Sequence, residues 1–231
     1  MRRNNDCQKT KKAIILHSGG LDSTTCLYWA LNQGYECVCL NIAYGQKHKK
    51  ERDCCRKICK KLKVKLIEIS LNLPWLKEVT SLVGNKVPIP NEPLAKIKRM
   101  GRLPSTYVPA RNLIFASIAA SLADSIGASA IVLGANSVDY SGYPDCRPRF
   151  YIPLERAIFE GTRSAVGGPR IAVLTPLLKL SKAQIAQMGA KLGVPFNLTW
   201  SCYRGGQKPC GKCDACRLRK AGFEKAGIKD I

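Results

Sequence analysis

A glycine turn flanked by hydroxyl residues constrains the fold of this chain more than any other feature. The apolar run Ala13-Ile-Ile-Leu16 is typical of a buried strand, and Ser18-Gly-Gly-Leu-Asp-Ser-Thr-Thr25 follows it at the start of a helical pattern. Glycines let the backbone turn tightly and bring its N–H groups close to a ligand. The helix N-terminus adds unpaired N–H donors and a partial positive charge. The turn therefore predicts an anion site that suits a phosphate group.

The side chains of this turn support the same prediction. Ser18, Ser23 and Thr24 carry hydroxyls that can donate hydrogen bonds to phosphate oxygens. Asp22 would repel a phosphate by itself, so we interpret it as a helix cap or as a ligand of a bound Mg²⁺, direct or through water. The turn lacks the spacing of the P-loop and of the dinucleotide-binding motif. An ordinary strand–turn–helix with a Ser or Asp cap is the simpler alternative. The complete six-residue motif from Ser18 to Ser23 favours the phosphate site.

The alternation of apolar runs and helical patterns predicts an α/β fold with a Rossmann-like parallel sheet of five strands flanked by helices. We expect strands at 13–16, 36–42, 64–69, 130–133 and 170–174, and helices at 22–32, 47–62, 112–126, 154–164 and 181–192, the last with Ser181 as its N-cap. We divide the chain into a basic tail (1–12), a nucleotide-binding α/β domain (13–198) and a C-terminal cysteine module with a helix (199–231). The proline-rich segment 71–108 is expected to be a long insertion loop.

Charge and hydropathy narrow the choice of partners. Lysine and arginine total 38 against 16 aspartate and glutamate residues, which gives a formal net charge of +22. This charge suits nucleic-acid binding, but the lysines are spread along the chain, and a site for ATP and an anionic substrate would also tolerate it. No apolar run approaches the roughly 20 residues of a membrane helix, and the N-terminus lacks a secretory signal. We therefore expect a cytoplasmic protein with neither a membrane nor a nucleic-acid partner.

Twelve cysteines in a chain without a signal peptide are expected to be thiols or metal ligands rather than disulfides. The three between residues 26 and 39 lie in apolar segments and are expected in the core. Cys54, Cys55 and Cys59 lie in a charged helical pattern, where we expect some semi-exposed thiols.

The cysteine module has the spacing of a metal site. Cys202, Cys210, Cys213 and Cys216 form the pattern C-x7-C-x2-C-x2-C. Four thiolates so close together can wrap a tetrahedral Zn²⁺ and close its coordination shell, which predicts a structural rather than a catalytic metal. The segment has few apolar residues, so metal binding would supply its folding free energy. An iron–sulfur cluster, a redox dithiol and a zinc ribbon that touches nucleic acid remain alternatives.

Five stretches together resemble the 7-cyano-7-deazaguanine synthase family of PP-loop ATP pyrophosphatases, from about Lys12 to Phe223. They are Leu16-His-Ser-Gly-Gly-Leu-Asp-Ser-Thr-Thr25, Tyr44-Gly-Gln-Lys-His48, Tyr107-Val-Pro-Ala-Arg-Asn112, Asp139-Tyr-Ser-Gly-Tyr-Pro-Asp-Cys-Arg147, and Thr199-Trp-Ser-Cys-Tyr203 with the Cys-Gly-Lys-Cys-Asp-Ala-Cys216 that follows it. The first stretch is shared by the superfamily, and the last two are more specific. Arg149 departs from the family, which more often has an acidic residue at that position.

The resemblance implies a fold similar to the adenine nucleotide alpha hydrolases and an ATP-dependent carbon–nitrogen ligase of queuosine biosynthesis. The carboxylate of 7-carboxy-7-deazaguanine would attack ATP to form an acyl adenylate, and ammonia would displace AMP to give an amide. A second ATP would activate the amide oxygen, and loss of AMP would leave the nitrile. A carboxylate needs this activation because oxide is a poor leaving group, so catalysis is mainly positioning and charge stabilisation. The family also suggests a homodimer, while the residues themselves predict one structural Zn²⁺ per chain and a bound Mg²⁺.

The resemblance and the residue types together give an expected site. We expect nucleotide binding by Leu16, His17, Ser18, Gly19, Gly20, Leu21, Asp22, Ser23, Thr24, Thr25 and Cys26, catalytic roles for Asp22, Ser23, Arg111, Asp139 and Asp145, and substrate binding by Tyr143, Arg147 and Lys182. Arg111 suits two-pronged binding of a phosphate or carboxylate. The 139–147 loop follows a strand, at the carboxyl edge where open α/β sheets bind ligands.

Simpler interpretations stay open for several of these residues. The 139–147 loop can be an ordinary polar turn, and Lys182 can be a solvated lysine. His48 is either a general base or a polar residue at a helix start. Cys146 need not be a nucleophile, since free ammonia can carry out the aminolysis, and we interpret it as a bystander thiol.

Two other functions fit part of the pattern. A PP-loop enzyme that activates a tRNA base carbonyl for sulfur or amine transfer is favoured by the charge of +22. It is opposed by the absence of an extra tRNA-binding domain and by the specific 139–147 loop. A zinc-ribbon nucleic-acid-binding protein with an inactive nucleotide fold is opposed by the intact phosphate turn.

Overall fold

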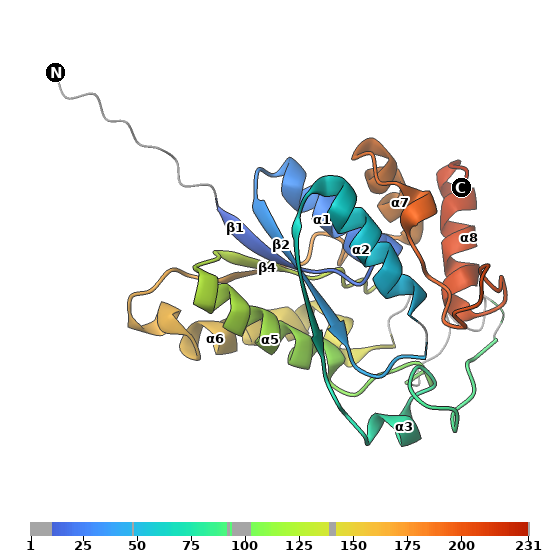
Figure 1. Cartoon of the computed structure of the whole chain (residues 1–231), viewed down its shortest axis with the longest axis horizontal. Helices are drawn as coiled ribbons and strands as arrows, with labels where there is room; N and C mark the ends of the chain where they lie inside the picture. Colours follow the sequence, from blue (N-terminus) through green and yellow to red (C-terminus); the bar gives the residue numbers. More distant parts are fainter. Residues whose placement is uncertain (1–10, 48, 92, 94–102, 139–141, 231) are drawn as a thin grey trace.

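Five parallel strands form the centre of the computed structural model, which describes residues 11–47, 49–91, 93, 103–138 and 142–230 (Figure 1). In space the strands run β3-β2-β1-β4-β5, and every neighbouring pair is parallel. Their bounds are Lys12–Leu16 for β1, Glu36–Ala43 for β2, Lys65–Ser70 for β3, Ala130–Val132 for β4 and Ala172–Leu174 for β5. The predicted five-stranded parallel sheet is confirmed.

Helices cover both faces of this sheet (Figure 1). One face carries α1 (Leu21–Asn32), α2 (Lys50–Leu62), α7 (Lys182–Lys191) and α8 (Asp214–Ala226), and the other carries α5 (Arg111–Ile126) and α6 (Pro148–Glu160). Short helical turns lie at Leu76–Val79 (α3), Pro144–Cys146, Arg163–Val166 and Phe196–Leu198. Within the part of the chain that the structure describes, no helix has both the length and the apolar character to cross a membrane.

The sheet divides the core into two halves because side chains alternate along each strand. Ala13 and Ile15 of β1 pack on the side of α1 and α2, in a cluster that also contains Phe223 of α8. Ile14 points to the other side, where small residues of α5 such as Ala116 are buried. The C-terminal helix therefore shares its core with the first strand.

One local prediction needs correction. The helix predicted at 154–164 begins earlier, at Pro148, and ends at Glu160; proline is well suited to a first helical position because its missing N–H is not needed there. The expectation of some semi-exposed thiols in the charged helix α2 is confirmed by Cys54. Cys55 and Cys59 are buried on the face of α2 that packs into the core.

The strand order creates a switch point between β1 and β4. From β1 the chain winds outward through β2 and β3 on one side, and β4 and β5 extend the sheet on the other. The segments that leave the carboxyl ends of β1 and β4 therefore diverge and leave a crevice, which is where open α/β sheets bind ligands. The glycine turn predicted to bind phosphate leaves β1 at this crevice.

Candidate functional site

A cleft of about 330 Å³ opens at the switch point. Its walls are the turn after β1, the residues after β4, the end of β2, the start of α5, and the C-terminal cysteine module. A volume of this size is within the usual range of small-molecule sites. Among the predicted site residues, the lining includes Leu16, His17, Ser18, Gly20, Leu21, Asp22, Ser23, Arg111, Tyr143 and Lys182.

The glycine turn packs tightly against helix α2. Gly19 has a φ of +95°, and a Cβ atom there would lie 2.1 Å from the Glu51 carbonyl oxygen and 2.6 Å from the Cys55 nitrogen. No side chain fits this space, so the turn requires glycine. Gly20 is the N-cap of α1 without a side-chain cap, and the helix N-terminus opens into the cleft. Asp22 is therefore not the helix cap that was one of its two predicted roles.

Glu51 is a site residue that the sequence analysis missed. The Ser18 hydroxyl donates a 2.7 Å hydrogen bond to Glu51 Oε1, and the Ser23 hydroxyl lies 3.1 Å from that of Ser18. Burial raises the pKa of Glu51 to about 7; Asp22 adds to the rise, while the Ser18 bond and the Arg111 charge oppose it. The sequence gives one indication that Glu51 belongs to the site: it is an acidic residue that follows the Tyr44–His48 stretch at the start of a basic helix.

Asp22 and Lys182 form an ion pair at the mouth of the phosphate turn. Lys182 is the first residue of α7, whose predicted N-cap Ser181 is confirmed in a capping box with Gln184. The second carboxylate oxygen of Asp22, Oδ1, is buried without a hydrogen-bond partner among the described residues, and so is the amide oxygen of Asn41 in the same lining. Buried acceptors without a donor are costly, so they indicate a site that a cation or a ligand N–H group completes.

Arg111, the first residue of α5, also lines the cleft. It follows Ala110, whose φ of +52° places a residue other than glycine in the left-handed region, and strain of this kind clusters at functional sites. Burial opposes the charge of its guanidinium, but the neighbouring Tyr44, Tyr143 and Cys146 outweigh burial and hold the pKa of Arg111 above its ordinary value. A permanently charged two-pronged donor therefore faces the cleft.

Asp145 holds the start of α5 in place. Its Oδ2 accepts a 3.0 Å hydrogen bond from the backbone N–H of Asn112, and its carbonyl oxygen accepts bonds from the Asn112 amide and the Tyr151 hydroxyl. The carboxylate thus serves as a cap for the helix that carries Arg111. The catalytic role predicted for Asp145 stays a prediction.

Some predicted residues do not reach the cleft. The side chains of Thr24, Thr25 and Cys26 form hydrogen bonds behind the turn, to His17 and to the carbonyl oxygens of Leu21 and Leu133. Arg147 lies in a neighbouring hollow beside Tyr143. Asp139 and His48 lie outside the described residues.

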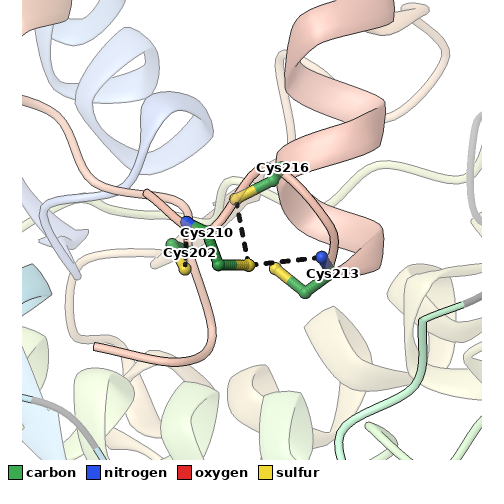
Figure 2. A group of neighbouring side chains, drawn as sticks. All are labelled: Cys202, Cys210, Cys213 and Cys216. Atoms are coloured by element: carbon green, nitrogen blue, oxygen red, sulfur yellow. Dashed lines mark hydrogen bonds between the residues drawn. The ribbon is translucent and has the colours of Figure 1, made fainter. Parts of the chain in front are cut away.

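The four sulfur atoms of the cysteine module converge on one point. Those of Cys202, Cys210, Cys213 and Cys216 lie within 4.8 Å of one another (Figure 2). A tetrahedral ion with metal–sulfur bonds of about 2.3 Å would separate its sulfurs by about 3.8 Å, and the Cys210 and Cys216 sulfurs are 4.0 Å apart. Backbone N–H groups donate to two of these sulfurs, which favours thiolates. The four-cysteine group therefore fits a metal site.

The module forms a wall of the cleft. The backbone N–H of Trp200 donates a 3.0 Å hydrogen bond to the carbonyl oxygen of Gly19, and its indole N–H donates to the carbonyl oxygen of Cys202 at 2.9 Å. Trp200 and Tyr203 also line the cleft. The sequence predicted the metal site but not its direct contact with the phosphate turn.

Comparisons with known proteins point to one family. The family model described as "Queuosine biosynthesis protein QueC" matches residues 12–227. The 7-cyano-7-deazaguanine synthase of Leptospira interrogans is 46% identical over 100% of this chain and 95% of the relative. The enzymes of that name from Acetivibrio thermocellus and Thermoplasma volcanium are 44% and 43% identical, over 95% of this chain and 96% and 89% of theirs. The solved structure of NMN synthetase from Francisella tularensis has a TM-score of 0.46 at 17% identity, covers 95% of this chain and 79% of its own, and is too dissimilar to carry a conclusion.

Proposed function

Because the chain belongs to the QueC family of queuosine biosynthesis proteins and is a 7-cyano-7-deazaguanine synthase, we propose how its cleft performs that reaction. ATP binds with its β- and γ-phosphates on the turn at Gly19 and Gly20, and 7-carboxy-7-deazaguanine binds beside Arg111. One observation carries the proposal: the phosphate turn and the Arg111 guanidinium line the same cleft at the switch point of the sheet.

The nucleotide end is built for negative charge. The N–H groups at the start of α1 and the hydroxyls of Ser18 and Ser23 donate to the pyrophosphate oxygens. Lys182, at the mouth of the turn, adds a positive charge. The unpaired Asp22 Oδ1 suits a Mg²⁺ ion, which when bound neutralises phosphate charge. The unpaired Asn41 oxygen suits an amino group such as that of adenine.

The substrate end combines charge with flat apolar walls. Arg111 orients the substrate carboxylate toward the α-phosphate, and Tyr143 and Phe115 line the space for a planar base. Burial raises the pKa of the Cys146 thiol to about 11, so the thiol stays protonated at neutral pH. A protonated thiol is a poor nucleophile, which favours free ammonia in that role. The amide then remains in the same place for the second activation.

The cysteine module has a structural role in this proposal. Zn²⁺ fits the four-sulfur group, and its closed shell holds the segment of Trp200 against the phosphate turn. The homodimer and the cytoplasmic location stay predictions.

Product analysis tests the proposal. Incubation with ATP, ammonium and 7-carboxy-7-deazaguanine should give the nitrile by mass spectrometry, with about two AMP released per nitrile because each oxygen leaves through one adenylation. The variant Gly19→Ala, purified in the same way, controls for contaminating enzymes. Unchanged acid would overturn the proposal. AMP release that depends on added tRNA would instead favour a PP-loop enzyme that acts on tRNA.

A further inference from the structure

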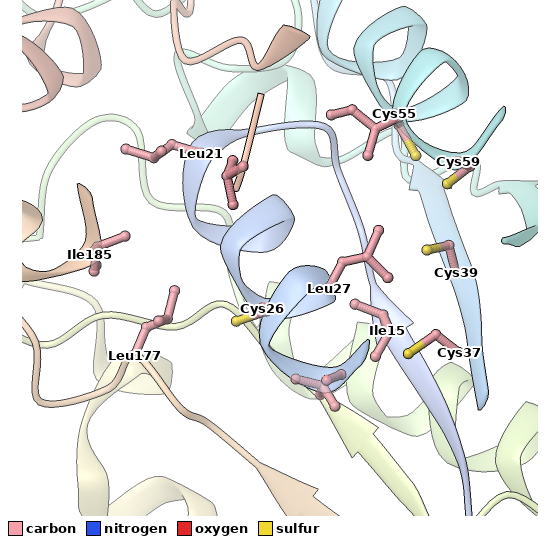
Figure 3. Packing of buried hydrophobic residues seen from close by; sticks show 14 of the residues in the cluster. Ile15, Leu21, Cys26, Leu27, Cys37, Cys39, Cys55, Cys59, Leu177 and Ile185 are labelled. Atoms are coloured by element: carbon pink, nitrogen blue, oxygen red, sulfur yellow. The ribbon is translucent and has the colours of Figure 1, made fainter. Parts of the chain in front are cut away.

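A second group of metal-binding side chains lies beneath the phosphate turn, away from the four-cysteine site. The sulfur atoms of Cys55 and Cys59 lie 3.2 Å and 3.6 Å from His17 Nδ1, and the three ligand atoms lie within 4.8 Å of one another. All three residues are buried, with His17 only 1% exposed. Figure 3 shows the sulfur of Cys39 gathered with those of Cys55 and Cys59 between β2 and α2.

We propose that His17, Cys39, Cys55 and Cys59 bind one structural Zn²⁺ ion, the second of the chain. Zinc–sulfur bonds of about 2.3 Å and a zinc–nitrogen bond of about 2.0 Å place sulfur and nitrogen about 3.5 Å apart in a tetrahedron. The two measured distances, 3.2 Å and 3.6 Å, are close to this value. Cys39 is not in the group whose ligand atoms all lie within 4.8 Å of one another, but its side chain is buried on β2 facing that group, so a turn of this side chain would supply the fourth ligand.

The fold brings these residues together from three elements. Cys55 and Cys59 are four residues apart on α2, so both point from the same face of the helix. His17 directly follows β1, and Cys39 lies on β2, where it pairs with Ile15. The wide spacing of the four residues in the sequence hid the group from motif analysis.

The orientation of His17 is the one that a metal ligand needs. Its Nε2 lies 3.2 Å from the Thr24 hydroxyl oxygen, and donation of Nε2–H to that oxygen leaves Nδ1 unprotonated toward the sulfurs. Without an ion, His17 Nδ1 would have only the weak S–H donors of Cys55 and Cys59 as partners within the described part of the chain. Three thiolates and an imidazole select a soft or borderline ion, and four such ligands are typical of structural zinc.

The position of this ion would tie it to the phosphate turn. His17 precedes Ser18, Thr24 lies in the first turn of α1, and the backbone of Cys55 touches Gly19. The ion would fix α2 against the turn from below, while the four-cysteine module contacts it through Trp200. The inference rests on ligand geometry and not on the proposed reaction.

Native mass spectrometry of the full chain, with elemental analysis of the same sample, counts the ions. We expect two zinc ions per chain. One zinc ion with the remaining thiols unmodified would overturn the proposal. So would one zinc ion with a chain lighter by two hydrogens, which would indicate a disulfide in the group.

Variants and spectroscopy locate the second ion. Cys59→Ala should reduce the content from two zinc ions to one, whereas Cys37→Ala should keep two. Cys37 is a matched control because it is buried on the same strand as Cys39, its sulfur donates to the Tyr35 carbonyl oxygen, and in Figure 3 it lies apart from the three sulfurs. If Cys59→Ala does not fold, X-ray absorption of the unmodified protein decides: a nitrogen ligand beside the sulfurs supports the proposal, and sulfur alone overturns it.

Discussion

The Ser18 hydroxyl donates a 2.7 Å hydrogen bond to the Glu51 carboxylate, so an acidic side chain stands beside the turn proposed to bind the phosphates of ATP. Burial raises the pKa of Glu51 to about 7. A protonated Glu51 carries no charge against the phosphates, whereas an ionised one repels them. A group that titrates near neutral pH therefore lies beside the phosphate turn, at the start of α2.

This titration makes stability depend on pH. The pKa of Glu51 is higher in the folded chain than in the unfolded one, so its contribution is fully present below about pH 4 and is lost as the pH rises through about 7. Glu51→Gln keeps an oxygen that accepts from Ser18 and removes the titration. We expect this variant to be more stable than the parent by about 2 kcal/mol at about pH 8, and equally stable at about pH 4.

Denaturant unfolding without nucleotide at both pH values measures this difference. Glu36→Gln, at an exposed position at the start of β2, serves as the control and should follow the parent at both. If the stability difference between Glu51→Gln and the parent were the same at both pH values, the assignment of this titration to Glu51 would be wrong. The ATP affinity of Glu51→Gln should also fall less than that of the parent as the pH rises above neutral.

Gly19 and Gly34 allow the cost of a positive φ to be measured separately from the cost of a steric clash. Both have positive φ values, +95° and +79°, but a Cβ atom would clash at Gly19 and would meet nothing within 4 Å at Gly34. Gly34→Ala should therefore cost about 1 kcal/mol of stability, the conformational penalty alone. Gly19→Ala should cost about 3 kcal/mol or more and abolish measurable ATP binding, because α2 or the turn must move. Calorimetry of unfolding and of ATP binding would show the contrast, and equal losses at the two positions would refute it.

The sequence predicted what is local and missed what distant segments bring together. The turn at Ser18 and Gly19 was recognised because a strand, two glycines and a helix start are adjacent in the chain. Glu51 and Trp200 were missed because they reach the turn only through the packing of α2 and of the cysteine module. The burial of Cys55 and Cys59 was not recognised, since the apolar face of α2 is small among its many charged residues.

Substitutions of Asp145 distinguish a capping role from a catalytic one. Asparagine caps a helix about as well as aspartate, while alanine does not. If Asp145 acts by fixing the start of α5, Asp145→Asn should keep activity and stability close to the parent. Asp145→Ala should lose about 1 kcal/mol of stability and about tenfold in kcat/KM, because Arg111 is no longer held in place. An Asp145→Asn variant as inactive as Asp145→Ala would instead support the catalytic role that the sequence predicts for Asp145.

Loss of the four-cysteine metal should weaken nucleotide binding at a distance. Cys213 is one of the four ligands. Trp200 lies two residues before Cys202, the first ligand, and its backbone N–H donates to the Gly19 carbonyl oxygen. Cys213→Ser should therefore remove one zinc ion and weaken ATP binding by about tenfold or more, since the wall over the turn loses its support. Elemental analysis and binding calorimetry on the same sample measure both effects.

A second thiol in the same neighbourhood controls for this substitution. Cys54 is semi-exposed on α2 and packs against the buried cluster around Trp200 without belonging to the four-sulfur group. Cys54→Ser should keep both the zinc content and the ATP affinity of the parent. Chelation of the parent should weaken ATP binding at least as much as Cys213→Ser does, and added Zn²⁺ should restore it, because the metal acts by organising the segments around the turn rather than by touching the nucleotide. If chelated protein bound ATP as tightly as before, the hydrogen bond from Trp200 to Gly19 would not depend on the metal, and the module would not support the phosphate turn.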